Sequence, residues 1–220
     1  LYAVNLNDRQ MYAVPIVRPA VAGTTPTAGT PVAIAMPLDL PGASTGCTQS
    51  QVRPFGLHTD SLGGGASLTC TGPSASNLRG YVYRYNETTS TWGTAPVLEF
   101  SLGGNRGRAW TGAFTANAAN WRPWADNFND GVSGSSYSDA QPLLSDLEFD
   151  ANGDLSIGIK DRTGDRVGMD AGNLTTGSTT TYEGFDAGDL LRACVSGTGW
   201  PLESAGACGG RTGCSMNNNQ

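Results

Sequence analysis

Several features that are common in globular proteins are scarce in this sequence. Charged residues make up 15% of the 220 residues, and Lys160 is the only lysine. The chain has no basic run and a net charge of -6, which argues against nucleic acid as a partner. Because no segment approaches the roughly 18 consecutive apolar residues of a membrane span, we also expect no membrane insertion.

Histidine and paired cysteines are scarce as well. His58 is the only histidine and no C-x-x-C pair occurs, which excludes the common zinc sites. A lysine-poor chain with spaced cysteines is typical of an oxidising, extracellular setting. The chain starts at Leu1 rather than Met, so we expect that an N-terminal signal has been removed.

The five cysteines divide into a pair and a group of three. We expect a disulfide between Cys47 and Cys70, which would contribute roughly 3 kcal/mol by the chain-entropy estimate. The pairing among the other three stays open, and one thiol is left over. These three are Cys194, Cys208 and Cys214.

Helical periodicity is almost absent, and Gly 31 and Pro 12 indicate a turn-rich, all-β chain. Short strands recur in groups of four at the spacing of propeller blades, about 50 to 60 residues. We therefore predict a single partial β-propeller domain over 1–220 with about three antiparallel blades. Closure typically takes at least about 4 blades, so we expect this chain to belong to a larger propeller or to close through neighbouring subunits. The predicted parts are an incomplete first blade over 1–40, a second blade over 53–102, a third blade over 142–203 and a cysteine-containing tail over 204–220.

The stretch 103–141 interrupts this rhythm and carries Trp110, Trp121 and Trp124. Loops of this length are usually functional or disordered, and three tryptophans argue against disorder. Either the tryptophans cover the sheet between blades, or they form an aromatic platform for a glycan or peptide.

The stretch FDANGDLSIGIKDRTGD over 149–165 contains several aspartates near glycines, as calcium-binding loops do. An EF-hand alignment fails because its twelfth position, which needs a bidentate acid, is Ile159. The alternative is a hairpin turn, since Asn-Gly-Asp is a strong turn signal. A different calcium site, formed by Asp150, Asn152 and Asp154, remains open. The charges of KDRTGD over 160–165 predict an ion-paired loop.

Catalytic machinery is not evident in the sequence. His58 stands near Asp60, which would orient it as a base, but no nucleophile motif accompanies it; the alternative is a structural, hydrogen-bonded histidine. Asn86 and Asn173 each begin an N-glycosylation triplet. We therefore predict a non-enzymatic protein without a cofactor. Calcium is the one cofactor that stays open.

The motifs LYAVNLNDRQMYAV, RPFGL and LSDLEFDANGDLSIGIKDRTGD resemble the propeller region of large bacterial cell-surface proteins, the SdrD-like or conserved-repeat surface proteins. The resemblance implies an extracellular or surface-exposed module in adhesion or surface assembly, with no catalytic residues to carry over. Two alternatives stay open, a carbohydrate-binding module and a calcium-dependent propeller hydrolase or lyase.

Overall fold

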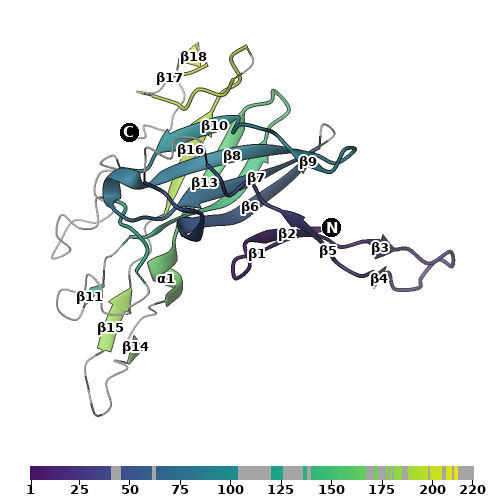
Figure 1. Cartoon of the computed structure of the whole chain (residues 1–220), viewed down its shortest axis with the longest axis horizontal. Coiled ribbons are helices and arrows are strands. Elements are labelled where there is room, and N and C mark those ends of the chain that lie inside the picture. Colours follow the sequence, from purple (N-terminus) through teal and green to yellow (C-terminus); the bar gives the residue numbers. More distant parts are fainter. Residues whose placement is uncertain are drawn as a thin grey trace.

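The computed structural model describes most of the chain, and its regular secondary structure is almost entirely β-strand (Figure 1). The predicted all-β class is therefore confirmed. The only α-helix among the described residues is α1 (Arg162–Arg166), and short 3-10 turns occupy Gln49–Gln51 and Ala75–Asn77. The described residues are 1–40, 46–60, 63–103, 120–125, 136–137, 140–166, 171–172, 177, 179, 181–184, 188–197, 199–204, 207–209 and 211–212.

A central antiparallel sheet has the order β10-β8-β7-β6, with β9 paired to β8. Side chains of successive strand residues point to opposite faces, and the run YVYRY follows this rule. Tyr81, Tyr83 and Tyr85 pack on one face, whereas Val82 packs on the other. The strands of this sheet are β6 (Val52–Asp60), β7 (Gly63–Cys70), β8 (Arg79–Asn86), β9 (Thr91–Trp92) and β10 (Leu98–Ser101).

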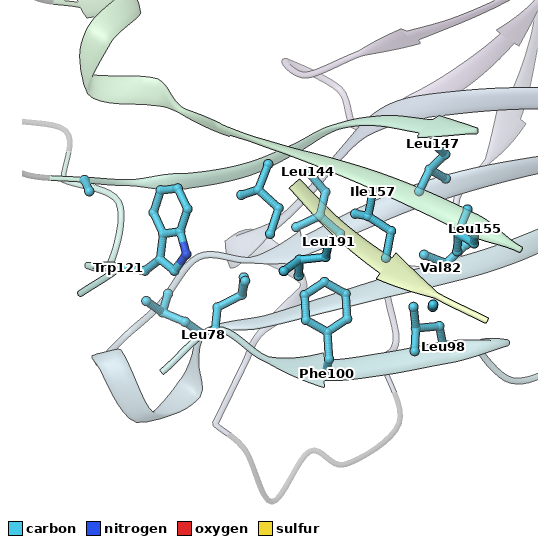
Figure 2. Close-up of a cluster of buried hydrophobic side chains, with 14 residues drawn as sticks. Leu78, Val82, Leu98, Phe100, Trp121, Leu144, Leu147, Leu155, Ile157 and Leu191 are labelled. Atoms are coloured by element: carbon cyan, nitrogen blue, oxygen red, sulfur yellow. The ribbon is translucent and has the colours of Figure 1, made fainter. Parts of the chain in front are cut away.

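Two further antiparallel sheets cover the faces of the central sheet. The N-terminal sheet, in the order β1-β2-β5, packs Met11 and Ile34 against the tyrosine face. The second sheet, in the order β12-β13-β16, encloses the larger core with the other face (Figure 2). The strands are β1 (Tyr2–Asn5), β2 (Gln10–Ala13), β5 (Val32–Ala35), β12 (Pro142–Phe149), β13 (Leu155–Asp161) and β16 (Asp189–Ala193).

Small side chains let β12 lie close against the central sheet. A methyl group on Gly56 would lie 3.0 Å from the backbone nitrogen of Asp146, so glycine is needed there. The Ser67 hydroxyl donates to the carbonyl of Leu144 at 2.8 Å, and the amide of Leu144 donates to the Thr69 hydroxyl at 3.0 Å. Side chains of the central sheet thus satisfy polar backbone groups of a buried strand.

Smaller elements lie around these layers (Figure 1). A hairpin of β3 and β4 extends away from the N-terminal sheet, and β17 pairs with β18 near the C-terminal end. A third small group has the order β11-β15-β14. Their bounds are β3 (Ile16–Val17), β4 (Thr27–Ala28), β11 (Ser136–Tyr137), β14 (Ala171–Gly172), β15 (Thr181–Gly184), β17 (Ala207–Cys208) and β18 (Arg211–Thr212).

The predicted blades correspond to these sheets only in part. Region 53–102 matches the five-stranded central sheet apart from Val52 at its start, whereas 142–203 gives a three-stranded sheet extended by a bridge between Ala193 and Leu202. The described strands form stacked open sheets and no closed ring, so the number of blades stays a prediction. Within the expected loop over 160–165, Lys160 and Asp165 do pair at 2.6 Å, but residues from Arg162 onward form the turn of α1.

Candidate functional site

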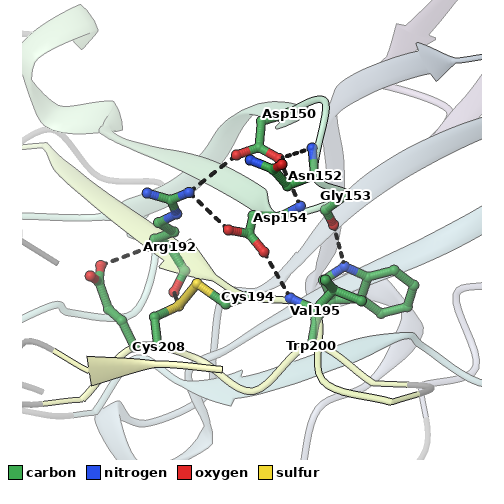
Figure 3. Close-up of polar contacts among 10 residues, drawn as sticks. Asp150, Asn152, Gly153, Asp154, Arg192, Cys194, Val195, Trp200 and Cys208 are labelled. Carbon is green, nitrogen blue, oxygen red and sulfur yellow. Dashed lines mark hydrogen bonds and ion pairs between the residues drawn. A yellow bond between two sulfur atoms is a disulfide. The ribbon is translucent and has the colours of Figure 1, made fainter. Parts of the chain in front are cut away.

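The turn between β12 and β13 is organised by its own backbone contacts (Figure 3). The Asp150 carboxylate accepts the amides of Asn152 at 2.7 Å and Asp154 at 3.0 Å. Gly153 has φ +82°, a conformation that glycine adopts without strain, and its amide donates to the carbonyl of Asp150 at 2.9 Å. These contacts explain why aspartate, asparagine and glycine occur here: they form the turn of a β-hairpin.

Arg192 on β16 joins the two aspartates of this turn (Figure 3). Its Nη2 atom lies 3.1 Å from Asp150 Oδ2 and 2.8 Å from Asp154 Oδ2. The other oxygen of Asp154 accepts the amide of Val195 at 3.0 Å. The carboxylates of two of the three proposed calcium ligands, Asp150 and Asp154, are thus already bound by a guanidinium and by backbone amides. Among the described residues, no group of three or more His, Cys, Asp or Glu side chains is placed to hold a metal ion.

Trp200, in the chain segment that follows β16, packs against the same turn. Its indole N–H donates to the carbonyl of Gly153 at 2.8 Å, and its ring lies edge-on to Phe149 with centroids 6.1 Å apart. The disulfide between Cys194 and Cys208 anchors the start of this segment to β17. Trp200 lies within the predicted third blade, 142–203, where the sequence analysis singled out no aromatic residue.

A hollow of ≈ 550 Å³ opens beside this turn. The residues that line it and matter for its chemistry are Asp60, Arg84, Phe149, Asp150, Ala151 and Trp200. A second hollow of ≈ 600 Å³ lies on the other side of Asp60, toward Tyr2 and Glu87. The C-terminal end of β6 therefore lies between two concave surfaces, and we call the first of them the Trp200 hollow.

Arg84 and Asp60 form a bidentate ion pair between β8 and β6. Their nitrogen–oxygen distances are 2.9 and 3.0 Å, and the guanidinium also lies 4.8 Å from the centroid of the Phe149 ring. Bidentate pairing fixes both the position and the orientation of the two groups. The ion pair therefore presents fixed donors and acceptors next to an aromatic ring.

His58 lies behind this pair, with 9% of its side chain exposed. Its Nδ1 atom is 3.2 Å from Glu148 Oε2, its Nε2 atom is 3.7 Å from Asp60 Oδ2, and its ring lies 5.1 Å from that of Phe149. The predicted proximity to Asp60 is present. The His58 ring thus contacts Glu148 and Phe149 of β12 and connects β6 to that strand.

The tryptophans of the predicted platform have other surroundings. Trp121 is 1% exposed in the larger core, and Trp110 lies outside the described residues. Trp124 has the guanidiniums of Arg162 and Arg53 at 4.3 and 5.3 Å from its ring centroid, and its N–H donates to the carbonyl of Pro142 at 2.7 Å. In the described part of 103–141, Trp121 thus packs in the core and the half-buried Trp124 packs against two arginines.

The remaining predicted residues are placed as follows. Cys47 and Cys70 form a disulfide across a separation of 23 residues, and Cys194 pairs with Cys208, whereas Cys214 lies outside the described residues. Asn86 is exposed, and its side chain accepts the amides of Thr88 and Thr89. Asn173 lies outside the described residues. No helix in the described part of the chain is long and apolar enough to cross a membrane.

The chain is similar to the colossins of the amoeba Dictyostelium discoideum. It is 28% identical to Colossin-C over 218 residues, which is 98% of this chain and 18% of that protein. It is 26% identical to Colossin-A over 194 residues, 82% of this chain and 2% of that protein. Colossin-D is 39% identical over 80 residues, 36% of this chain and 7% of that protein.

These comparisons correct the resemblance drawn from the motifs. The relatives are proteins of a eukaryote, so the assignment to bacterial SdrD-like surface proteins is wrong. The chain spans less than a fifth of the length of each of these relatives. No family model matches the chain, and no solved structure matches it.

Proposed function

We propose that this chain is a non-enzymatic extracellular module that acts in attachment or extracellular assembly, together with the remainder of a longer chain or with neighbouring subunits. The observation that carries the proposal is the β3–β4 hairpin, which extends beyond the stacked sheets (Figure 1). It exposes Ile16 to 46%, Val17 to 56% and Val21 to 70%. A projecting hairpin that exposes several large apolar side chains is a candidate interaction surface.

The two disulfides support the extracellular part of the proposal. Cys47–Cys70 attaches the segment before β6 to the end of β7, and Cys194–Cys208 attaches the last described hairpin to the end of β16. Disulfides persist in oxidising compartments and are rare in the cytosol. If the protein is purified from its source without reductant and then denatured, four of its five cysteines should resist a thiol reagent. Five reactive thiols would contradict this location.

The stacking of the sheets supports a blade-like arrangement within the same proposal. Strands of the central sheet follow one another in chain order, as do β12, β13 and β16, and β12 crosses close to β6 at Gly56. The repeating unit of a propeller is an antiparallel sheet, and consecutive sheets pack face to face. Further sheets from a longer chain or a second subunit would cover the open faces in such an assembly.

Sedimentation velocity over a range of protein concentrations tests the role in assembly. We expect the native chain to associate as concentration rises and the variant I16S/V17S/V21S to remain monomeric with an unchanged melting temperature. Leu190→Ser is the matched control, because Leu190 is an exposed apolar residue, 49% exposed, on β16. A native chain that is monomeric throughout, or a triple variant that associates equally well, would rule out the hairpin as the assembly surface.

A carbohydrate-binding module is the second candidate function. The Trp200 hollow favours it, because an aromatic ring stands there beside fixed hydrogen-bonding groups. Binding sites for small molecules commonly combine these two features.

A further inference from the structure

We infer that the Trp200 hollow is a binding site for a neutral saccharide ring, with Trp200 as the stacking surface and the Asp60–Arg84 pair as the polar contact. This inference rests on the proposed non-enzymatic, extracellular role and gives it a ligand class. The hollow measures ≈ 550 Å³ and lies between the end of β6, the β12–β13 turn and the segment after β16. That volume falls within the usual range for small-molecule sites, about 300 to 1,000 Å³.

The aromatic wall is fixed in place before any ligand arrives. Trp200 is half-buried, its N–H is held by Gly153 at 2.8 Å, and its ring is braced edge-on by Phe149 at 6.1 Å. A ring held in this way loses little conformational entropy when a ligand stacks on it. Because its polar N–H is already engaged, the surface that Trp200 contributes to the hollow is apolar, as the C–H face of a pyranose requires.

The charges around the hollow select a neutral ligand. Asp60 is paired with Arg84, and Asp150 is paired with Arg192, so the carboxylates are balanced by guanidiniums. A cationic ligand would have to compete with two arginines, and an anionic ligand would face the two carboxylates. A paired carboxylate keeps further acceptor positions, and sugar hydroxyls both donate and accept. The paired groups should therefore bind a ligand with neutral hydroxyl groups better than a cationic or an anionic ligand.

His58 lies on the same face of β6 as Asp60, two residues before it. His58 has 9% of its side chain exposed, and its buried Nε2 atom, 3.7 Å from Asp60 Oδ2, has no hydrogen-bond partner in the structure. The other ring nitrogen is held by Glu148 at 3.2 Å. The polar contact for the saccharide is thus positioned by the two hydrogen bonds from Arg84, and the largely buried His58 ring packs beside it without a hydrogen bond to Asp60.

The test is isothermal titration of the native chain with cellotetraose, chitotetraose, maltotetraose and a β-galactan tetrasaccharide, together with a tetralysine peptide and a tetragalacturonate as charged probes. We expect at least one neutral probe to bind with a Kd of roughly 1 mM or lower and both charged probes to fail. Ala151→Trp should weaken that binding by about tenfold or more, because the exposed Ala151 lines the hollow and a bulky side chain there would occupy the ligand position.

Ala33→Trp is the matched control, since Ala33 is an exposed alanine on β5, away from the hollow. It should leave the affinity unchanged, and equal melting temperatures of both variants would exclude misfolding. The inference is overturned if no neutral probe binds, if a charged probe binds instead, or if Ala151→Trp binds as well as the native chain. Self-association measured by sedimentation is a separate readout, so loss of saccharide binding alone leaves the proposed assembly function standing.

Discussion

Asp154 and Arg192 join the β12–β13 turn to β16 across 38 residues of sequence, with 2.8 Å between Asp154 Oδ2 and Arg192 Nη2. The Asp154 side chain is 1% exposed, whereas Asp150, which contacts the same nitrogen at 3.1 Å, is 38% exposed. One guanidinium therefore contacts a buried and a partly exposed carboxylate. The two aspartates of one short turn should differ in their contribution to stability.

Replacing each aspartate by asparagine separates these contributions. Asp154→Asn should lower the free energy of unfolding by about 2 to 3 kcal/mol, because a buried, charge-assisted interaction is lost. Asp150→Asn is the matched control and should cost less than about 1 kcal/mol, since partly exposed ion pairs contribute little. Urea denaturation of the three proteins measures both values. Equal losses would contradict the assigned burial of Asp154.

Calcium should leave the melting temperature unchanged. The carboxylates of Asp150 and Asp154 are bound by Arg192 and by the amides of Asn152, Asp154 and Val195, so an added cation would have to displace an arginine. Thermal melts with millimolar calcium and with EDTA should agree within about 1 °C, because only binding to the folded state stabilises it. A melting temperature that climbs with calcium concentration would restore the calcium site.

Gly80 on β8 lies tightly between Phe100 of the neighbouring strand β10 and Leu144 of β12, which leads to a prediction. A methyl group there would lie 2.4 Å from Phe100 Cζ and 3.0 Å from Leu144 Cδ2, inside the larger core. Gly80→Ala should therefore destabilise the fold by about 1 to 3 kcal/mol through overpacking. Gly199→Ala, which meets nothing within 4 Å, should change stability by less than about 0.5 kcal/mol. Similar values for both variants would mean that the two sheets are less tightly packed than described.

Local patterns predicted the strands well, whereas the contacts around the Trp200 hollow join residues that lie far apart in the sequence. YVYRY over 81–85 alternates within one strand, and Asn152-Gly153-Asp154 is a self-contained turn signal, so both were predictable from adjacent residues. The hydrogen bond from Trp200 to Gly153 spans 47 residues, and no local pattern encodes such a partner. For the same reason the sequence placed the aromatic platform in 103–141, where tryptophans are dense. Density alone did not reveal that Trp121 is buried or that Trp124 is packed between arginines.

Tyr83 should make the fold sensitive to alkaline pH. The side chain is 2% exposed, and burial raises its pKa from the ordinary 10.0 to about 12, with Tyr81 and Glu99 adding to the shift. Because the folded-state pKa is raised, the neutral phenol stabilises the fold fully below pH 10. That contribution falls as pH rises toward about 12, since the unfolded chain loses its proton first.

Urea denaturation at intervals between pH 9 and pH 12 tests this dependence in the native chain and in Tyr83→Phe. The native chain should lose about 2 kcal/mol more than the variant over this window, because the pKa of Tyr83 is about 12 in the folded chain and 10.0 in the unfolded chain. Phe100→Leu is the control, because it alters a buried side chain without removing a titrating group, and its stability should fall with pH as steeply as that of the native chain. Parallel stability curves for the native chain and Tyr83→Phe would contradict the prediction. They would mean that the pKa of Tyr83 is the same in the folded and unfolded chains, so that its hydroxyl is not buried.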